Sequence, residues 1–159
     1  MNTKVFISHQ KKDKKDAKEI ADYLKKGGIE VYFDEYDRGL QIATENNNPK
    51  AVVSAIKTGI DNSTHMLCLI SKNTLYSKWV PFEVGYGYDK TDLATVTLKG
   101  ISNLELPDYI KVAPIIRSTN DLDMFVEKYG NKYALERRGF SEYKSDSHPL
   151  NNVMDTVIS

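Results

Sequence analysis

The run Met66-Leu67-Cys68-Leu69-Ile70 is apolar at every position, and this stretch decides the fold class. A continuous apolar run of strand length is typical of a central strand in a parallel sheet, because helices cover both faces of such a sheet. The run Val5-Phe6-Ile7 is also apolar and ends in the polar residues Ser8-His9-Gln10. We therefore expect two buried strands, each followed by a polar loop.

Helical periodicity fills the segments between the expected strands. Between the first two, Ala17, Ile20, Ala21 and Leu24 recur at helical spacing, and Gly27-Gly28 ends the helix because glycine tolerates the left-handed conformation found there. Asn48 and Pro49 predict the cap and the first turn of the next helix. Further strands are expected at 29–33, 95–98 and 112–116, and further helices around 79–86, 122–129 and 150–157. Pro114 cannot donate to a strand ladder, so the 112–116 strand is expected at an edge.

This alternation of strands and helices predicts an α/β fold, a doubly wound parallel sheet with helices on both faces. Ligands of such sheets bind outside the carboxyl ends of the strands. That rule nominates four places in this chain. They are Ser8-His9-Gln10, Asp34-Glu35, Ser71-Lys72-Asn73 and the start of the helix that carries Trp79 and Glu83.

Composition narrows the class of protein. The chain has 159 residues, the size of one domain, with 22 basic and 22 acidic residues. Without a basic excess, binding to a nucleic-acid backbone is not expected. The single cysteine, Cys68, fits a reducing compartment. No apolar stretch approaches the ~20 residues of a membrane span, and the first residues do not have the pattern of a signal peptide. We expect a cytoplasmic protein that does not enter a membrane.

Several common catalytic signatures are missing from the sequence. It contains no G-x-x-x-x-G-K-[ST] phosphate loop, no G-x-G-x-x-G after the first strand and no G-x-S-x-G elbow. His9, His65 and His148 lack the spacing of metal ligands, so no metal site is expected.

Trp79 and Glu83 are separated by four residues and share one face of their expected helix. A carboxylate beside an aromatic ring can bind a ribose diol while the ring stacks on a base. It can also stabilise the positive charge that develops at an anomeric carbon when a glycosidic bond breaks. Spacing alone favours a simpler interpretation, with Trp79 half-buried in the core and Glu83 on the solvent face.

Several stretches together resemble the Toll/interleukin-1 receptor (TIR) domain. Val5-Phe6-Ile7-Ser8-His9 resembles its first strand, and the segment 28–34 resembles its second strand and the start of the long loop that follows. The segment 71–83, with a strand-end serine and then serine, tryptophan and glutamate, is the most telling, and 51–63 resembles the helix before the third strand. The resemblance covers residues 4 to 90. It implies a flavodoxin-like, five-stranded parallel sheet and a single TIR domain over 1–159. The core would span about 4–130, and 131–159 would be a C-terminal accessory segment with a short helix.

The resemblance also implies an activity, since some TIR domains cleave NAD+ at the nicotinamide–ribose bond with a glutamate at the position of Glu83. NAD+ would be the substrate, with no cofactor, and the product ADP-ribose or a cyclic isomer. Glu83 would be catalytic and Trp79 a stacking wall. The substrate-binding residues would be Ser8, His9, Gln10, Phe33, Asp34, Arg38, Ser71 and Trp79. His9 could equally be an exposed loop residue. For Asp34, loop capping comes ahead of substrate contact, and Ser71 fits a turn better than a ligand.

A compact TIR protein of this kind resembles the signal-producing component of a Thoeris-type anti-phage defence system. That implies self-association through TIR surfaces and a downstream effector that senses the nucleotide product. The long segment 35–48 would be a lid or an assembly surface. Two alternatives stay open: a non-enzymatic TIR interaction or scaffold module, and an enzyme like the nucleoside deoxyribosyltransferases. A phospho-acceptor receiver domain would need an aspartate at the end of the third strand, where this chain has Ile70-Ser71.

Overall fold

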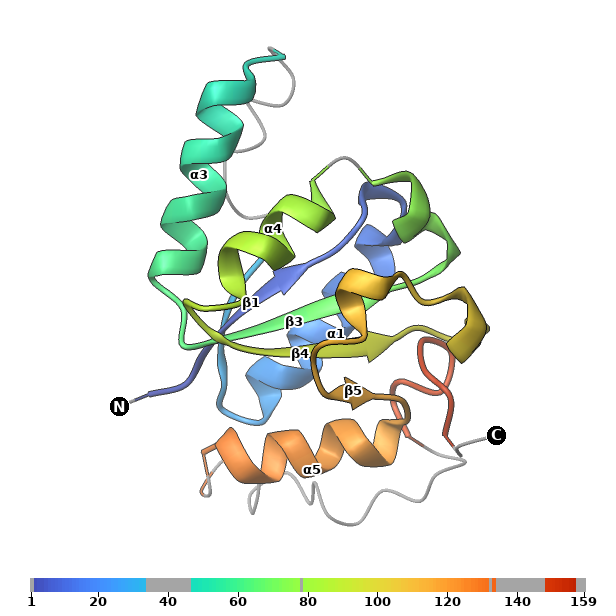
Figure 1. Cartoon of the computed structure of the whole chain (residues 1–159). Coiled ribbons are helices and arrows are strands. Elements are labelled where there is room, and N and C mark those ends of the chain that lie inside the picture. Colours follow the sequence, from blue (N-terminus) through green and yellow to red (C-terminus); the bar gives the residue numbers. More distant parts are fainter. Residues whose placement is uncertain (1, 34–46, 78, 132, 134–147, 157–159) are drawn as a thin grey trace.

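The computed structural model places a five-stranded, all-parallel sheet at the centre of the molecule (Figure 1). It describes residues 2–33, 47–77, 79–131, 133 and 148–156. The strands are β1 (Lys4–Ser8), β2 (Glu30–Tyr32), β3 (His65–Ile70), β4 (Asp92–Thr97) and β5 (Ile115–Ile116). Their order, β2-β1-β3-β4-β5, is that of a flavodoxin-like sheet and confirms the predicted fold class.

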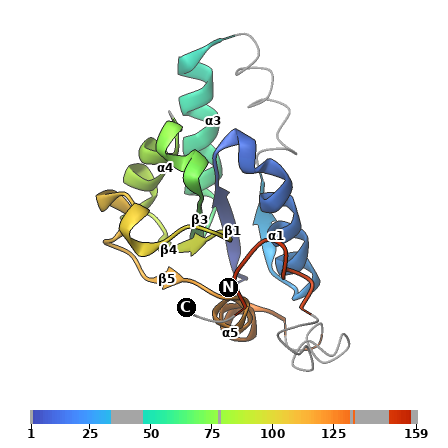
Figure 2. The ribbon, with the colours of Figure 1, turned by 90° about the vertical axis from the view of Figure 1, so that its right-hand side faces the viewer.

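Helices cover both faces of the sheet, as predicted. They are α1 (Lys14–Lys26), α3 (Pro49–Asp61), α4 (Val80–Gly87) and α5 (Thr119–Tyr129). Helices α1 and α5 lie on one face, and α3 and α4 lie on the other (Figure 2). Short 3-10 helices join them: η1 (Lys11–Asp13), η3 (Lys72–Tyr76), η4 (Asn103–Glu105) and η5 (Asp108–Ile110). No helix in the described ranges is both long enough and apolar enough to cross a membrane.

Strand β3 is the middle strand, and its side chains from Met66 to Ile70 are fully buried. Leu67 and Leu69 pack in the core on the α1 and α5 side, whereas Met66, Cys68 and Ile70 pack under α3 and α4. This two-sided burial is the reason that the run is apolar at every position.

The predicted helix signals and edge strand are confirmed. The Asn48 side chain accepts a hydrogen bond from the backbone N–H of Ala51 at 3.2 Å, with Pro49 at the start of α3. Gly28, just past α1, has a φ of 84°, which is strained for a residue with a side chain. Strand β5 lies at the edge, where the carbonyl of Pro114 accepts from the N–H of Thr95 at 2.8 Å.

The segment 148–156 differs from the predicted short helix. Leu150, Val153 and Met154 are buried in the core on the α1 and α5 side, but the described residues form turns. The backbone finds partners elsewhere in the fold, and this ends helical pairing after one turn. The carbonyl of Val153 accepts from Lys99, and that of Asp155 accepts from Thr119. The helical spacing therefore predicted correctly which side chains are buried, but it predicted the wrong backbone conformation.

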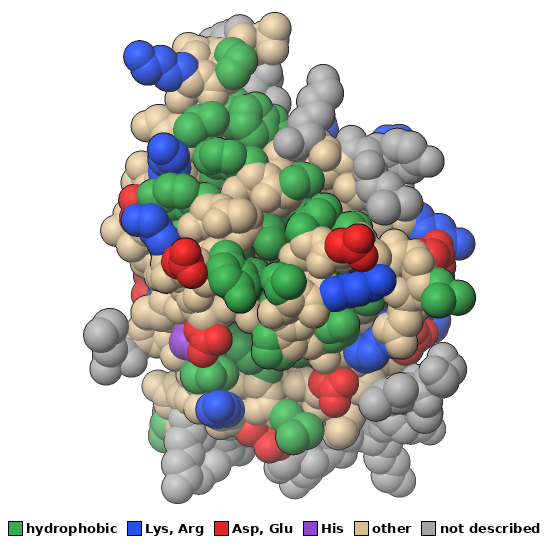
Figure 3. Space-filling model, in the orientation of Figure 1, with side chains coloured by type: hydrophobic (Ala, Val, Ile, Leu, Met, Phe, Trp, Pro, Cys, Tyr) green, Lys and Arg blue, Asp and Glu red, His purple; other side chains and the backbone are tan. Residues whose placement is uncertain are grey.

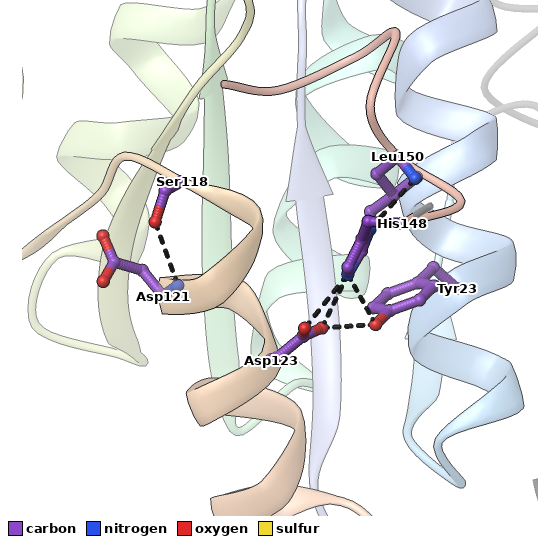
Figure 4. A network of polar contacts seen from close by, with 6 residues as sticks. All are labelled: Tyr23, Ser118, Asp121, Asp123, His148 and Leu150. Carbon is purple, nitrogen blue, oxygen red and sulfur yellow. Dashed lines mark hydrogen bonds and ion pairs between the residues drawn. The ribbon is translucent and has the colours of Figure 1, made fainter. Parts of the chain in front are cut away.

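Three polar side chains fasten this segment to the two helices beneath it (Figure 4). Tyr23 of α1 donates a hydrogen bond to Asp123 of α5. The Nε2 atom of His148 lies 2.9 Å from both the Tyr23 hydroxyl and Oδ1 of Asp123. The segment is therefore part of the domain's interior on this face.

Candidate functional site

The candidate site lies where the order of strand addition reverses, between β1 and β3. Strand β2 continues the sheet to one side of β1, and the chain then crosses to β3 on the other side. Because the connections leave in opposite directions, the carboxyl ends of these two strands are the place at which ligands of this fold class bind. The segments that begin there are η1 after β1 and η3 followed by α4 after β3.

Glu83 is buried against the sheet, with 3% of its surface exposed. The turn that starts α4 sets this position. The hydroxyl of Ser77 accepts from the N–H of Val80 at 3.0 Å, and the N–H of Glu83 donates to the carbonyl of Trp79 at 2.9 Å. Pro81 falls in the first turn, where its missing N–H costs nothing. The interpretation that placed Glu83 on the solvent face is therefore wrong.

Beneath α4, three small side chains that end in a hydroxyl or a thiol form a row across three strands. Ser8 of β1 is in register with Cys68 of β3, and Cys68 is in register with Thr95 of β4. Residues in register on parallel strands point to the same face, which here is the face covered by α3 and α4. All three side chains are fully buried. The Thr95 hydroxyl makes no hydrogen bond within the described part of the chain.

The Cys68 thiol shows how close Glu83 comes to this row. Burial raises the pKa of the thiol, the nearby Glu83 carboxylate raises it further, and the Ser8 hydroxyl lowers it through a hydrogen bond. Tyr109 of η5 also lies near: burial first and then Cys68 raise the pKa of its phenol. The Ser8 hydroxyl and the Glu83 carboxylate therefore both act on the Cys68 thiol. A carboxylate in such surroundings is uncommon in proteins and is expected at functional sites.

Trp79 is the residue immediately before α4, and its side chain is half-buried. Its ring meets that of Phe82 edge to face, with the centroids 6.2 Å apart. Phe82 in turn stacks on Tyr86 at 6.2 Å, so three half-buried aromatic rings follow one another along α4 and pack against the core under α3 and α4. Hydrophobic side chains gather on the surface formed by α3 and α4 (Figure 3).

His9 and Gln10 follow the end of β1, and Phe33 follows the end of β2. The ring of His9 stacks on that of Phe33, with centroids 5.1 Å apart and planes at 28°. Phe33 is 2% exposed and packs in the core, so it supports His9 from below. The Gln10 side-chain oxygen accepts from the N–H of Lys12 at 2.5 Å, which makes Gln10 the cap of η1.

Ser71 begins η3, where its hydroxyl accepts from the N–H of Asn73 at 3.0 Å. The same hydroxyl donates to the carboxylate of Asp13 at 2.5 Å. Ser71 therefore caps the first turn of η3.

The structure therefore places Glu83 and Ser8 near the same thiol, with Trp79 immediately before the helix that carries Glu83. Asp34 and Arg38 lie outside the described residues. Sequence reasoning missed Asp13, Cys68 and Thr95 as parts of the site. Only the strand register could have pointed to Cys68 and Thr95, and one sequence does not give that register. Among the described residues, no group of three His, Cys, Asp or Glu side chains is placed to hold a metal ion.

Comparison with known proteins agrees with this architecture. The family model for the TIR domain matches residues 5–137. No curated protein matches the chain. A match over this much of the chain, on a sheet of the order found here, shows that the protein belongs to the TIR domain family.

Proposed function

We propose that this TIR domain cleaves NAD+ at the bond between nicotinamide and ribose, with Glu83 as the catalytic residue. The observation that carries the proposal is the burial of Glu83 near Cys68, which is in register with Ser8 at the end of β1. Carboxylates are seldom buried to this extent, and buried ones are concentrated at functional sites. Glu83 lies near enough to the Cys68 thiol to raise its pKa, and its helix follows β3 at the sheet edge where ligands of this fold class bind.

The chemistry of the reaction suits a site with one carboxylate. The bond between C1′ of the ribose and the nicotinamide nitrogen breaks, and its electron pair leaves with nicotinamide, which departs as a neutral molecule. No general acid is needed for that step. The ribose ring is left with a positive charge shared between C1′ and the ring oxygen, and a fixed carboxylate stabilises that charge. Glu83 would also bind the ribose hydroxyls, with Trp79 as the wall of the pocket.

The acceptor of the ribosyl cation decides the product. Water adds its oxygen to C1′, loses one proton and gives ADP-ribose. A nucleophile within the same molecule gives a cyclic isomer, and exclusion of water favours that route. Under this proposal Ser8, His9 and Gln10 contact the substrate at the end of β1, and Asp34 and Arg38 contact it from the segment after β2.

The resemblance stated above extends the proposal to a biological role, the production of a nucleotide signal in Thoeris-type anti-phage defence in the cytoplasm. An effector that binds the product would be the downstream partner. Copies of the domain would associate through TIR surfaces, and the balanced charge of the chain presents no net repulsion to that association.

The test is chromatography of products after incubation of the protein with NAD+. We expect nicotinamide release by the wild type and a loss of about 10²–10³-fold in Glu83→Gln, which keeps the shape and removes the charge. Glu127→Gln, on the exposed side of α5, is the matched control and should keep full activity. Each protein is assayed dilute and concentrated, because activity that depends on self-association rises faster than protein concentration.

Each alternative gives a different result in the same assay. Full activity in Glu83→Gln would contradict the catalytic role. Turnover of nucleosides without turnover of NAD+ would favour the deoxyribosyltransferase-like alternative. No turnover of either substrate at high protein concentration would favour an interaction module.

A further inference from the structure

Asp13 is a buried carboxylate, 5% exposed, that joins two segments far apart in the sequence. It lies at the end of η1, and both of its oxygens accept hydrogen bonds from the segment that begins η3. Oδ2 accepts from the hydroxyl of Ser71 at 2.5 Å, and Oδ1 accepts from the side-chain amide of Asn73 at 2.8 Å. Hydrogen bonds to a charged acceptor are among the stronger ones in proteins.

The carboxylate does not serve its own helix. Asp13 immediately precedes α1, a position at which aspartate commonly accepts a hydrogen bond from a backbone N–H of the first turn. Here the side chain makes no such bond, and both oxygens face η3. The negative charge of Asp13 helps to raise the pKa of Asp16, although burial and the charge of Glu19 have larger effects. The N-terminal end of α1 favours a negative charge at this place.

The two segments joined by Asp13 follow the two strands at which the strand order reverses. On one side, the N–H of Asp13 donates to the carbonyl of Gln10 at 2.9 Å, so that η1 closes directly after His9 and Gln10. On the other side, η3 leads through Ser77 into the first turn of α4, which carries Trp79 and Glu83. One carboxylate therefore bridges the segments that follow β1 and β3.

We propose that Asp13 is a positioning residue that fixes the connection after β1 against η3 and so sets the width of the substrate pocket. This inference rests on the proposed NAD+ cleavage for its effect on activity. The bonds themselves are tested separately below. Asp13 touches no reacting atom under the proposal, so its effect falls on substrate binding more than on the chemical step.

The first experiment measures the effect on substrate binding. Asp13→Ala should raise the KM for NAD+ by about tenfold or more, the effect expected when bonds to a charged acceptor are lost, while kcat falls less. Asp13→Asn should restore most of the wild-type KM, because the amide oxygen can accept from Asn73 while the hydroxyl of Ser71 reverses to accept. Asp22→Asn, in a surface ion pair with Lys18, is the matched control and should leave KM unchanged. An unchanged KM in a folded Asp13→Ala protein would overturn the proposal.

The second experiment needs no activity. Hydrogen exchange should become faster at the N–H of Asn73, which donates to Ser71, and at the N–H of Thr74 in Asp13→Ala. The loss of stability in Asp13→Ala combined with Asn73→Ala should be smaller than the sum of the two single losses. Unchanged exchange and additive losses would overturn the positioning role even if NAD+ were cleaved. If NAD+ were not cleaved but exchange rose, the proposed function alone would fail.

Discussion

The phenol of Tyr23 donates a hydrogen bond to the carboxylate of Asp123, and this bond ties α1 to α5 across 100 residues of sequence. His148 enters the same group in a defined tautomer. The backbone N–H of Leu150 donates to Nδ1 of the ring at 3.1 Å, so the proton of the neutral ring lies on Nε2, which faces Asp123 at 2.9 Å. Figure 4 shows the three side chains pointing toward one another.

Removal of the Tyr23 hydroxyl tests this network. Tyr23→Phe keeps the buried ring and takes away a hydrogen bond to a charged group, so the free energy of unfolding should fall by about 1.5–3 kcal/mol. Urea denaturation followed by circular dichroism measures the change. Tyr88→Phe, at a position that is 51% exposed, is the control and should have the stability of the wild type. Equal stability of both variants would show that the Tyr23 hydroxyl contributes nothing to stability.

His65 should make the protein less stable in mild acid. Burial lowers the pKa of its ring, Asp92 opposes that shift and Lys128 adds to it. The unfolded chain therefore binds a proton at a higher pH than the folded one. Stability is lost as the pH falls below about 6.5, the ordinary value for histidine. In His65→Phe, whose new ring would lie beside Phe125 and Tyr129, the loss between pH 7.5 and pH 5.5 should be smaller. Identical pH profiles for the two proteins would contradict this account.

The Cys68 thiol should be unreactive in the folded protein. It is fully buried, and burial raises its pKa, so almost no thiolate forms at pH 8. Mass spectrometry after iodoacetamide treatment should find no modification in buffer and full modification in urea. The folded protein keeps this proton to a higher pH than the unfolded chain, so stability should fall as the pH rises above about 9. Cys68→Ala should weaken that alkaline loss, and rapid labelling in buffer would disprove the burial.

Two helical glycines should respond to alanine in opposite directions. A Cβ at Gly59 of α3 would lie 2.7 Å from the ring of Tyr32 and 2.9 Å from the ring of Phe6. These rings stack on each other and cannot easily move, so Gly59→Ala should destabilise the protein by about 1–3 kcal/mol. A Cβ at Gly85 of α4 would meet nothing within 4 Å, so Gly85→Ala should stabilise by about 0.4–1 kcal/mol. The melting temperatures of both variants measure these changes. Shifts of the same sign in the two variants would contradict the packing described.

The sequence predicted those parts of the fold that depend on neighbouring residues. The apolar run of β3, the cap formed by Asn48 and the edge position of the strand after Pro114 are each explained by local chemistry. The site was predictable only in part. The spacing of Trp79 and Glu83 places them on one helix face, but it does not show that Glu83 packs against the sheet. Strand register brings Ser8, Cys68 and Thr95 into one row, and a contact across 58 residues joins Asp13 to Ser71. Pairings at such distances depend on the whole fold.

The segment that carries His148, Leu150, Val153 and Met154 also bears on the order in which the protein is made. The buried residues of the core under α3 and α4 lie between positions 6 and 110. They have therefore all been synthesised while much of the last third of the chain is still missing. The core under α1 and α5 lacks part of its apolar surface until residue 154 has been synthesised. On a ribosome, one side of the sheet could therefore pack early, while the other would keep a hydrophobic gap exposed to chaperones.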